Sequence, residues 1–214
     1  MSANCCDHPP VNQLSDDPYR RVLWAVLGIN AAMFFLEIFA GLAAGSASLQ
    51  ADALDFLADT ANYGISLFVV GMALQYRARA ALAKGTTMAV FGVWVLATSL
   101  WHVIYGTVPE AFTMGAVGMA ALLANAASLA LLWVYRSGDS NMRSVWLCSR
   151  NDVVGNVAVL LAALGVFGTG SGWPDVVVAA LMGGLALHGA WHVVHQAFGE
   201  LSPPQIPMAA SRRV

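Results

Sequence analysis

Six long apolar stretches, separated by short links rich in Gly, Ser, Pro and Thr, make up most of the 214-residue chain. Each stretch is close to the roughly 20 residues that an α-helix needs to cross the hydrocarbon layer of a bilayer. The sequence therefore predicts an all-α membrane protein with six transmembrane helices. We expect these helices at about residues 22–44, 49–74, 86–106, 113–135, 143–168 and 174–197.

The two ends of the chain are polar and too short to fold by themselves. We expect a flexible cytoplasmic tail at residues 1–21, a six-helix transmembrane domain at residues 22–198, and a short cytoplasmic tail at residues 199–214. The orientation follows from the Lys and Arg residues, because membrane proteins retain positive charge on the cytoplasmic side. All 10 of them lie on one side if both termini are cytoplasmic, and the three outer links have none.

The overall composition agrees with this class of protein. Hydrophobic residues make up 58% of the chain and charged residues 10%, whereas about a quarter of the residues in an ordinary soluble domain are charged. The Lys and Arg residues form no patch, so we expect the lipid bilayer and no nucleic acid as a partner. The 3 Cys residues do not form the pattern of a disulfide framework. The first apolar run is too long for a signal peptide.

The second apolar stretch contains three carboxylates, those of Asp52, Asp55 and Asp59. Their spacing of three and four residues places all three on one helical face. Acidic groups at membrane depth are costly, so they usually face a polar cavity and a partner. Since no basic residue in this helix neutralises them, we expect a cation from outside the chain. A water-lined or partly protonated structural face is the alternative.

The fifth stretch offers a matching pair, because Cys148 lies one helical turn before Asp152. Side chains at i and i+4 on one helix can bind one metal ion. Together with Asp55 and Asp59 this pair supplies four donors, the number that a tetrahedral divalent site requires. Taken alone, Cys148 is more simply explained as a small buried hydrophobic residue.

In the order of these residues the chain resembles the cation diffusion facilitator family, whose members export divalent metals. The resemblance covers about residues 20–198. The residues that carry it are Asn30, Glu37 and Gly41 ahead of the run GSASLQADALDFLAD, then Asn125, then Asn141-Met142-Arg143 through Asp152 and on to Val159, and Asp175. It implies that the transmembrane domain is a transport domain with a central metal site made of Asp55, Asp59, Cys148 and Asp152.

Two departures from the family pattern bear on this expectation. Cys148 occupies a position that the family usually fills with His or Asp, and a thiolate favours soft ions such as Zn²⁺ or Cd²⁺ over Mn²⁺ or Mg²⁺. The neighbouring amides of Asn151 and Asn156 are alternative donors at this point. We also expect a short form that lacks the family's usual C-terminal cytoplasmic domain.

Further candidate ligands lie outside this quartet. They are Asp52, Asn151, Asn156, His188, His192, His195, Cys5, Cys6 and His8. The three His residues lie on one face of the sixth helix, which suits a metal access site, a proton relay or a hydrogen-bonded face between helices. The two Cys and the His of the N-terminal tail lie close together, which suits either metal capture or an ordinary disordered end.

The resemblance implies a transporter that exports a divalent heavy metal, Zn²⁺ or Cd²⁺ before others, from the cytoplasm by proton antiport. Antiport also follows from the residues, because an empty pocket cannot keep three neighbouring acids ionised, so protons enter as the metal leaves. The resemblance further implies a homodimer, for which close contacts at Gly41 and Gly45 or at Gly183 and Gly184 are candidates.

We expect no enzymatic activity and no permanently bound cofactor, since the metal is cargo. The expected location is the cytoplasmic membrane of a bacterium, with a role in metal resistance. Two other classes stay open: a membrane metal sensor or scaffold, and an intramembrane aspartyl protease. The protease is disfavoured, because it would be expected to carry a Gly-x-Gly-Asp run, whereas residues 149–152 read Ser-Arg-Asn-Asp.

Overall fold

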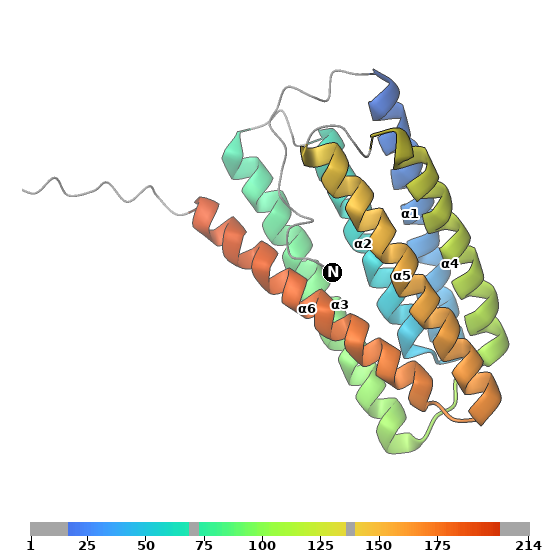
Figure 1. Cartoon of the computed structure of the whole chain (residues 1–214). Helices are drawn as coiled ribbons and strands as arrows, with labels where there is room; N and C mark the ends of the chain where they lie inside the picture. The colour runs from blue at the N-terminus through green and yellow to red at the C-terminus, as the bar shows by residue number, and fades with distance from the viewer. Residues whose placement is uncertain (1–16, 69–72, 136–139, 202–214) are drawn as a thin grey trace, which may run out of the picture.

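The computed structural model describes residues 17–68, 73–135 and 140–201. In these residues helices are joined by short links and there is no strand, so the predicted all-α class is confirmed. The elements, drawn in Figure 1, are α1 (Asp17–Ala44), α2 (Ala47–Phe68), α3 (Leu74–Tyr105), α4 (Ala111–Leu132), the short 3-10 helix η3 (Trp133–Tyr135), α5 (Ser140–Thr169) and α6 (Trp173–Leu201).

Helix α2 lies at the centre of the arrangement. Helices α1, α2, α4 and α5 pack side by side, while α3 and α6 form a pair beside them (Figure 1). Side chains of α2 take part in apolar clusters with α3 and α6, with α4 and α5, and with α1 and α4. Because neighbours enclose α2, most of its polar side chains are buried, including those of Asp52, Asp55 and Asp59.

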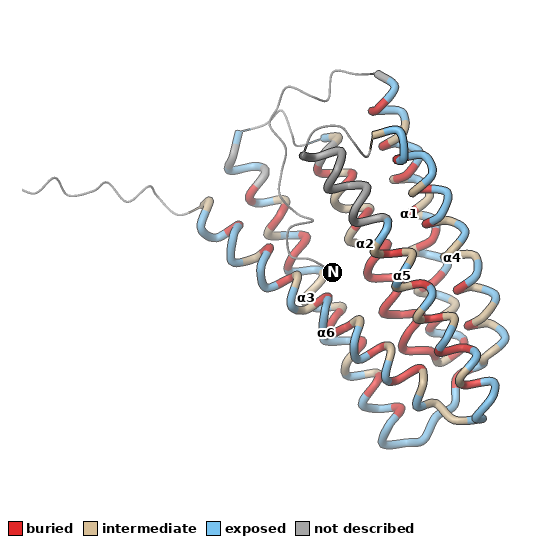
Figure 2. Tube along the Cα trace, viewed as in Figure 1, coloured by how far each residue is buried: buried red, intermediate tan, exposed pale blue. Residues whose placement is uncertain are grey.

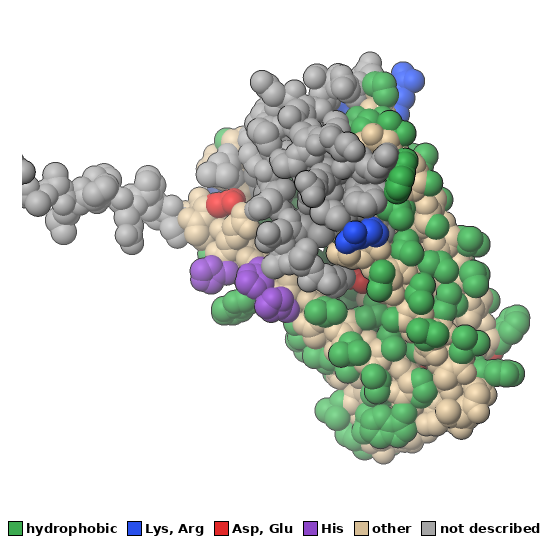
Figure 3. Space-filling model, viewed as in Figure 1, with side chains coloured by type: hydrophobic (Ala, Val, Ile, Leu, Met, Phe, Trp, Pro, Cys, Tyr) green, Lys and Arg blue, Asp and Glu red, His purple; other side chains and the backbone are tan. Residues whose placement is uncertain are grey.

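The exposed surface is far more apolar than that of a soluble protein, and several acids are buried in the interior. Phe39, Phe112 and Phe167 are exposed at 67%, 81% and 83%, whereas the carboxylates of Glu37 and Asp175 are completely buried. Figure 2 shows buried positions alternating with exposed ones along α4 and α6, and Figure 3 shows hydrophobic side chains spread over the outer surface. An apolar surface of this extent indicates contact with lipid.

Five helices of the described segments are long and apolar enough to cross a membrane, namely α1, α3, α4, α5 and α6. This supports a multi-pass membrane protein. Helix α2 has 22 residues, about 33 Å of helix, but it includes Asp52, Asp55 and Asp59. Its composition therefore differs from that of the other five, and the sixth span stays a prediction.

The predicted boundary between the second and third helices is wrong. Helix α2 ends at Phe68 instead of residue 74, and α3 begins at Leu74 instead of residue 86. The segment that begins α3 reads LQYRARAALAK, and its Ala, Leu, Arg and Lys residues are strong helix formers. Its positive charges mark the end of the apolar stretch but not the end of the helix. Arg79 and Lys84 consequently lie on a helix and not in a loop.

Helix α2 begins at a tight turn that α6 stabilises. Gly45 in this turn has a φ of +64°, a left-handed conformation that glycine adopts without strain. Asp175, in the first turn of α6, accepts four hydrogen bonds from the start of α2. The donors are Ser46 Oγ at 2.7 Å, Ala47 N at 2.8 Å, Ser48 N at 3.0 Å and Ser48 Oγ at 2.6 Å. A carboxylate at this position caps a helix N-terminus, and it joins α6 to the helix that carries the acids.

Two of the glycines proposed for a dimer contact pack inside the chain instead. A Cβ on Gly41 would lie 3.0 Å from Cγ of Gln50, so this glycine lets α1 approach α2. A Cβ on Gly183 would lie 3.2 Å from Cδ2 of Leu96, so this glycine serves the contact between α6 and α3. Neither residue is therefore available for a second copy of the chain.

Candidate metal centre

The three carboxylates of α2 point into the protein rather than toward lipid. Asp52 is 1% exposed, Asp55 9% and Asp59 7%. Their helical spacing puts them on one face, and α5 carries a fourth acid, Asp152, that is also buried. Buried ionised groups require pairing with opposite charge, a proton or a metal.

Asp152 of α5 lies directly beside the acids of α2. The carboxyl groups of Asp59 and Asp152 are within hydrogen-bonding reach of each other, and the charge of Asp55 acts on both. Gly155, one turn after Asp152, brings the backbone of α5 close to the same face. A Cβ on Gly155 would lie 3.9 Å from Oδ2 of Asp55 and 4.0 Å from Oδ1 of Asp52.

Asp59 also has neighbours that are not acids. The hydroxyl of Tyr63, one turn further along α2, donates a 3.0 Å hydrogen bond to Oδ2 of Asp59. The ammonium group of Lys84, on α3, donates to Oδ1 of Asn62 and lies near enough for its charge to act on Asp59. One side of the acid cluster is thus partly neutralised by the protein itself.

A second buried polar group adjoins the cluster at Asp52. Nδ2 of Asn125 donates to Oδ1 of Asn156 at 2.8 Å, and Nδ2 of Asn156 donates to Oδ2 of Asp52 at 2.6 Å. The carboxyl groups of Asp52 and Glu37 are within hydrogen-bonding reach of each other. No N–H or O–H group in the described part of the chain donates to Glu37. The pair therefore requires a proton or a cation between its oxygens.

The donors of the predicted quartet are brought together in part. Asp59 and Asp152 lie beside each other between α2 and α5, and Asp55 is near enough for its charge to act on Asp152. The side chain of Cys148, one turn before Asp152, lies outside the described residues. Among the side chains that are described, no three His, Cys, Asp or Glu residues converge into a ready metal site. Oxygen donors from two helices nevertheless face one buried region. A bound cation could draw these oxygens closer together, and protons could replace the cation when it leaves.

The other candidate ligands fall into separate places. Asn156 contacts Asp52 rather than the pair formed by Asp59 and Asp152, and Asn151 is half-buried. His188 and His192 are exposed on α6 with their Nε2 atoms 3.2 Å apart. His195 is also exposed, with its ring 6.2 Å from that of Trp191. Figure 3 shows these imidazoles on the outer surface, and the tail residues Cys5, Cys6 and His8 lie outside the described residues.

Sequence reasoning did not single out three residues that adjoin the acids. Glu37 is predicted only through the family resemblance, and Lys84 lies in a segment that hydropathy predicts to be a loop. Tyr63 lies four residues after Asp59, on the same helical face. Glu37 and Lys84 could have been identified from the sequence, because an isolated charge at membrane depth indicates a specific partner.

Comparison with known proteins gives a consistent result. Residues 23–202 match the cation efflux transmembrane domain family. The chain is 26% identical to the protein named zinc transporter ZitB of Escherichia coli (strain K12), in an alignment that covers 99% of this chain and 72% of that protein. It is 29% identical to the ZitB protein of Pectobacterium atrosepticum, over 91% of this chain and 65% of the relative. It is 25% identical to the metal cation efflux system protein CzcD of Cupriavidus metallidurans, over 86% and 60%.

Proposed function

Because the chain belongs to the cation diffusion facilitator family, we propose that it exports Zn²⁺ from the cytoplasm in exchange for protons. Members of this family are divalent metal efflux transporters rather than enzymes. We propose Zn²⁺ first because relatives are named zinc transporters. The soft donor Cys148 makes Cd²⁺ the next candidate. The proposed ligands are Asp55, Asp59, Cys148 and Asp152.

The observation that carries this proposal is the meeting of Asp152 on α5 with Asp59 and Asp55 on α2. These three carboxylates are buried inside an apolar helical bundle, and their mutual repulsion opposes folding unless a cation or protons occupy the space between them. A divalent cation neutralises two of the charges at once. The cluster therefore has the composition of a cation site rather than of a structural contact.

Proton exchange is supported by the same geometry. Two carboxyl groups within hydrogen-bonding reach, such as Asp59 and Asp152, share a proton when no metal lies between them. A metal ion binds only the deprotonated donors, so its arrival releases protons and its departure takes them up. Each transport cycle then moves protons against the metal.

We further propose six membrane spans with both termini in the cytoplasm of a bacterium. Arg20, Arg79 and Arg150 lie in the first halves of α1, α3 and α5. The starts of these odd-numbered helices share one side of the membrane, and positive charge marks the cytoplasmic side. A homodimer is expected from the family. Since Gly41 and Gly183 are used inside the chain, its contact must be made by other residues.

The test is metal-dependent proton flux in liposomes that contain the full-length protein. With Zn²⁺ added outside and a proton-sensitive dye inside, we expect Asp152→Asn and Asp59→Asn to reduce the flux by at least about tenfold. Each change removes a negative ligand but keeps the size of the side chain. Glu110→Gln is the matched control, because Glu110 is an exposed acid at the start of α4. Wild-type flux in Asp152→Asn would contradict the proposed site, and Zn²⁺ binding without flux in the wild type would indicate a sensor.

A further inference from the structure

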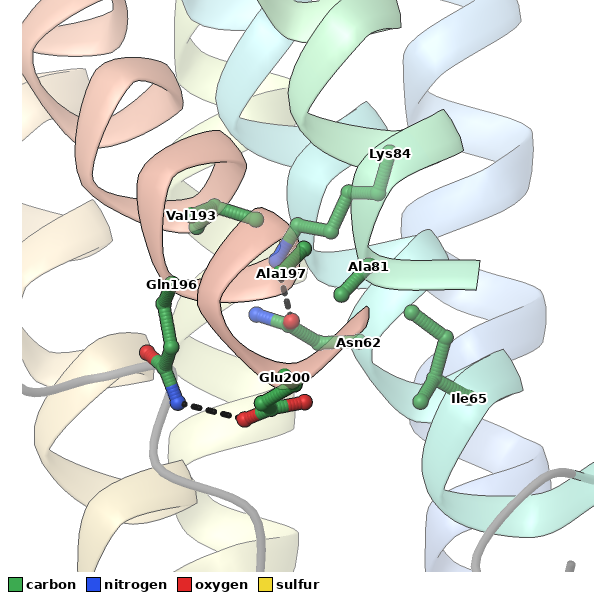
Figure 4. Close-up of a pocket in the computed structure, with 8 residues that line it drawn as sticks. All are labelled: Asn62, Ile65, Ala81, Lys84, Val193, Gln196, Ala197 and Glu200. Atoms are coloured by element: carbon green, nitrogen blue, oxygen red, sulfur yellow. Dashed lines mark hydrogen bonds between the residues drawn. The ribbon is translucent and has the colours of Figure 1, made fainter. Parts of the chain in front are cut away.

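A small pocket lies between α2, α3 and α6 (Figure 4). Its lining residues are Asn62, Ile65, Ala81, Lys84, Val193, Gln196, Ala197 and Glu200. Asn62 follows Asp59 by three residues on α2, so the two side chains lie on neighbouring parts of one helical face. The pocket therefore adjoins the proposed metal site at Asp59.

Lys84 connects this pocket to the acid cluster. It is the single Lys in the chain, and 8% of its surface is exposed. Figure 4 shows its side chain reaching from α3 to Asn62 on α2, and its charge also acts on Asp59. Burying an ammonium group is costly, and negative charge close to it lowers that cost. The carboxylate of Asp59 supplies such charge near Lys84.

We propose that Lys84 is a built-in positive charge that weakens cation binding at the central site and thereby allows the metal to leave. This inference rests on the proposed function and adds a residue that sets the affinity of the site. Three carboxylates carry more negative charge than a divalent ion neutralises, so without compensation they would hold the ion tightly. The positive charge of the Lys84 ammonium group acts on Asp59, and it therefore also repels a divalent cation bound beside Asp59.

The pocket also offers the ammonium a second carboxylate. Glu200 of α6 lines the same space and accepts a 3.1 Å hydrogen bond from Nε2 of Gln196. The ammonium group of Lys84 therefore lies in a space that an acid of α6 also lines.

The test is Zn²⁺ binding to the full-length protein in lipid nanodiscs, measured by titration calorimetry at pH 8. Lys84→Gln removes the charge and keeps a polar side chain, and we expect its dissociation constant for Zn²⁺ to fall on the order of tenfold. Release of Zn²⁺ to a chelator, followed by stopped flow, should slow by a similar factor. Lys84→Arg keeps the charge and should stay within about twofold of the wild type.

The matched control is Arg79→Gln, which removes a positive charge from an exposed position earlier on α3. It should leave Zn²⁺ affinity unchanged, since water screens exposed charges. Unchanged or weaker Zn²⁺ binding in Lys84→Gln would overturn the inference, and Lys84→Met answers the same question if Lys84→Gln does not fold. Absence of Zn²⁺ binding in the wild type would instead overturn the proposed function, and this inference with it.

Discussion

Replacing Asp175 by Asn tests how α6 holds the helix that carries the acids. Asp175 is completely buried. Its Oδ1 accepts from Ser46 Oγ, Ser48 N and Ser48 Oγ, and its Oδ2 accepts from Ala47 N at 2.8 Å. An amide has one acceptor oxygen, so it can replace Oδ1 but turns an NH₂ group toward Ala47 N. The variant therefore keeps three weaker bonds and leaves one buried N–H without an acceptor.

The expected cost follows from these losses. An unsatisfied buried N–H costs about 1–3 kcal/mol, and removing a negative charge from a helix N-terminus costs about 0.5–2 kcal/mol. We therefore expect Asp175→Asn to lower the free energy of unfolding by about 2–4 kcal/mol. For a chain of this size that corresponds to a fall in Tm of roughly 5–15 °C. Asp175→Ala should cost more, because it removes all the bonds.

Thermal unfolding in detergent, followed by the fluorescence of the 7 Trp residues, measures this change. Glu110→Gln is the matched control, because Glu110 caps α4 through Thr113 N at 3.1 Å but is exposed. Its loss should cost no more than about 1 kcal/mol. Equal Tm values for Asp175→Asn and Glu110→Gln would refute the reasoning. A weaker Zn²⁺ affinity of Asp175→Asn with an unchanged Tm would indicate that Asp175 is a ligand.

Two further predictions concern α5. Cys148→Ser should reduce Cd²⁺ flux more than Zn²⁺ flux, because Cd²⁺ depends more on sulfur. Cys148→His should restore Zn²⁺ flux, since imidazole is a good Zn²⁺ ligand. Equal Zn²⁺-to-Cd²⁺ flux ratios in wild type, Cys148→Ser and Cys148→Ala would show that Cys148 is not a ligand. Gly155→Val should weaken Zn²⁺ binding on the order of tenfold in calorimetry, because a branched side chain would extend from a Cβ that is 3.9 Å from Oδ2 of Asp55. Gly168→Val, on the same helix with open space around it, is the control, and an equal effect of both changes would contradict this explanation.

Much of the fold could be predicted because each helix carries its own signal. An apolar stretch long enough to span a bilayer is a local property, and so is the spacing that puts Asp52, Asp55 and Asp59 on one face. The predicted start of α3 is wrong because hydropathy, also a local property, does not mark where a helix begins. Hydropathy measures the match to lipid, whereas the helix continues through Arg79 and Lys84, which have high helix propensity but are not apolar.

For the candidate site, the family resemblance and the residue spacing predict only the proposed ligands. Asp152 is predicted together with Asp55 and Asp59, and in the fold these acids are near enough for their charges to act on one another, but no three His, Cys, Asp or Glu side chains of the described residues converge on one point. The pairing of Glu37 with Asp52 and the approach of Lys84 to Asp59 involve residues from different helices. The local sequences of α1 and α3 do not determine how these helices are rotated relative to α2.

The sequence by itself determined that this protein is a bundle of apolar helices with acids on one face of α2. Those properties depend on residue type and on the period of one helix. Only the tertiary structure decided which groups meet the acids, because the rotation and separation of two helices depend on side-chain packing over their whole contact. Small residues such as Gly41 and Gly155 set those separations, and Asp175 joins the start of α2 to α6. Each partner of a buried charge is therefore selected by the fold as a whole.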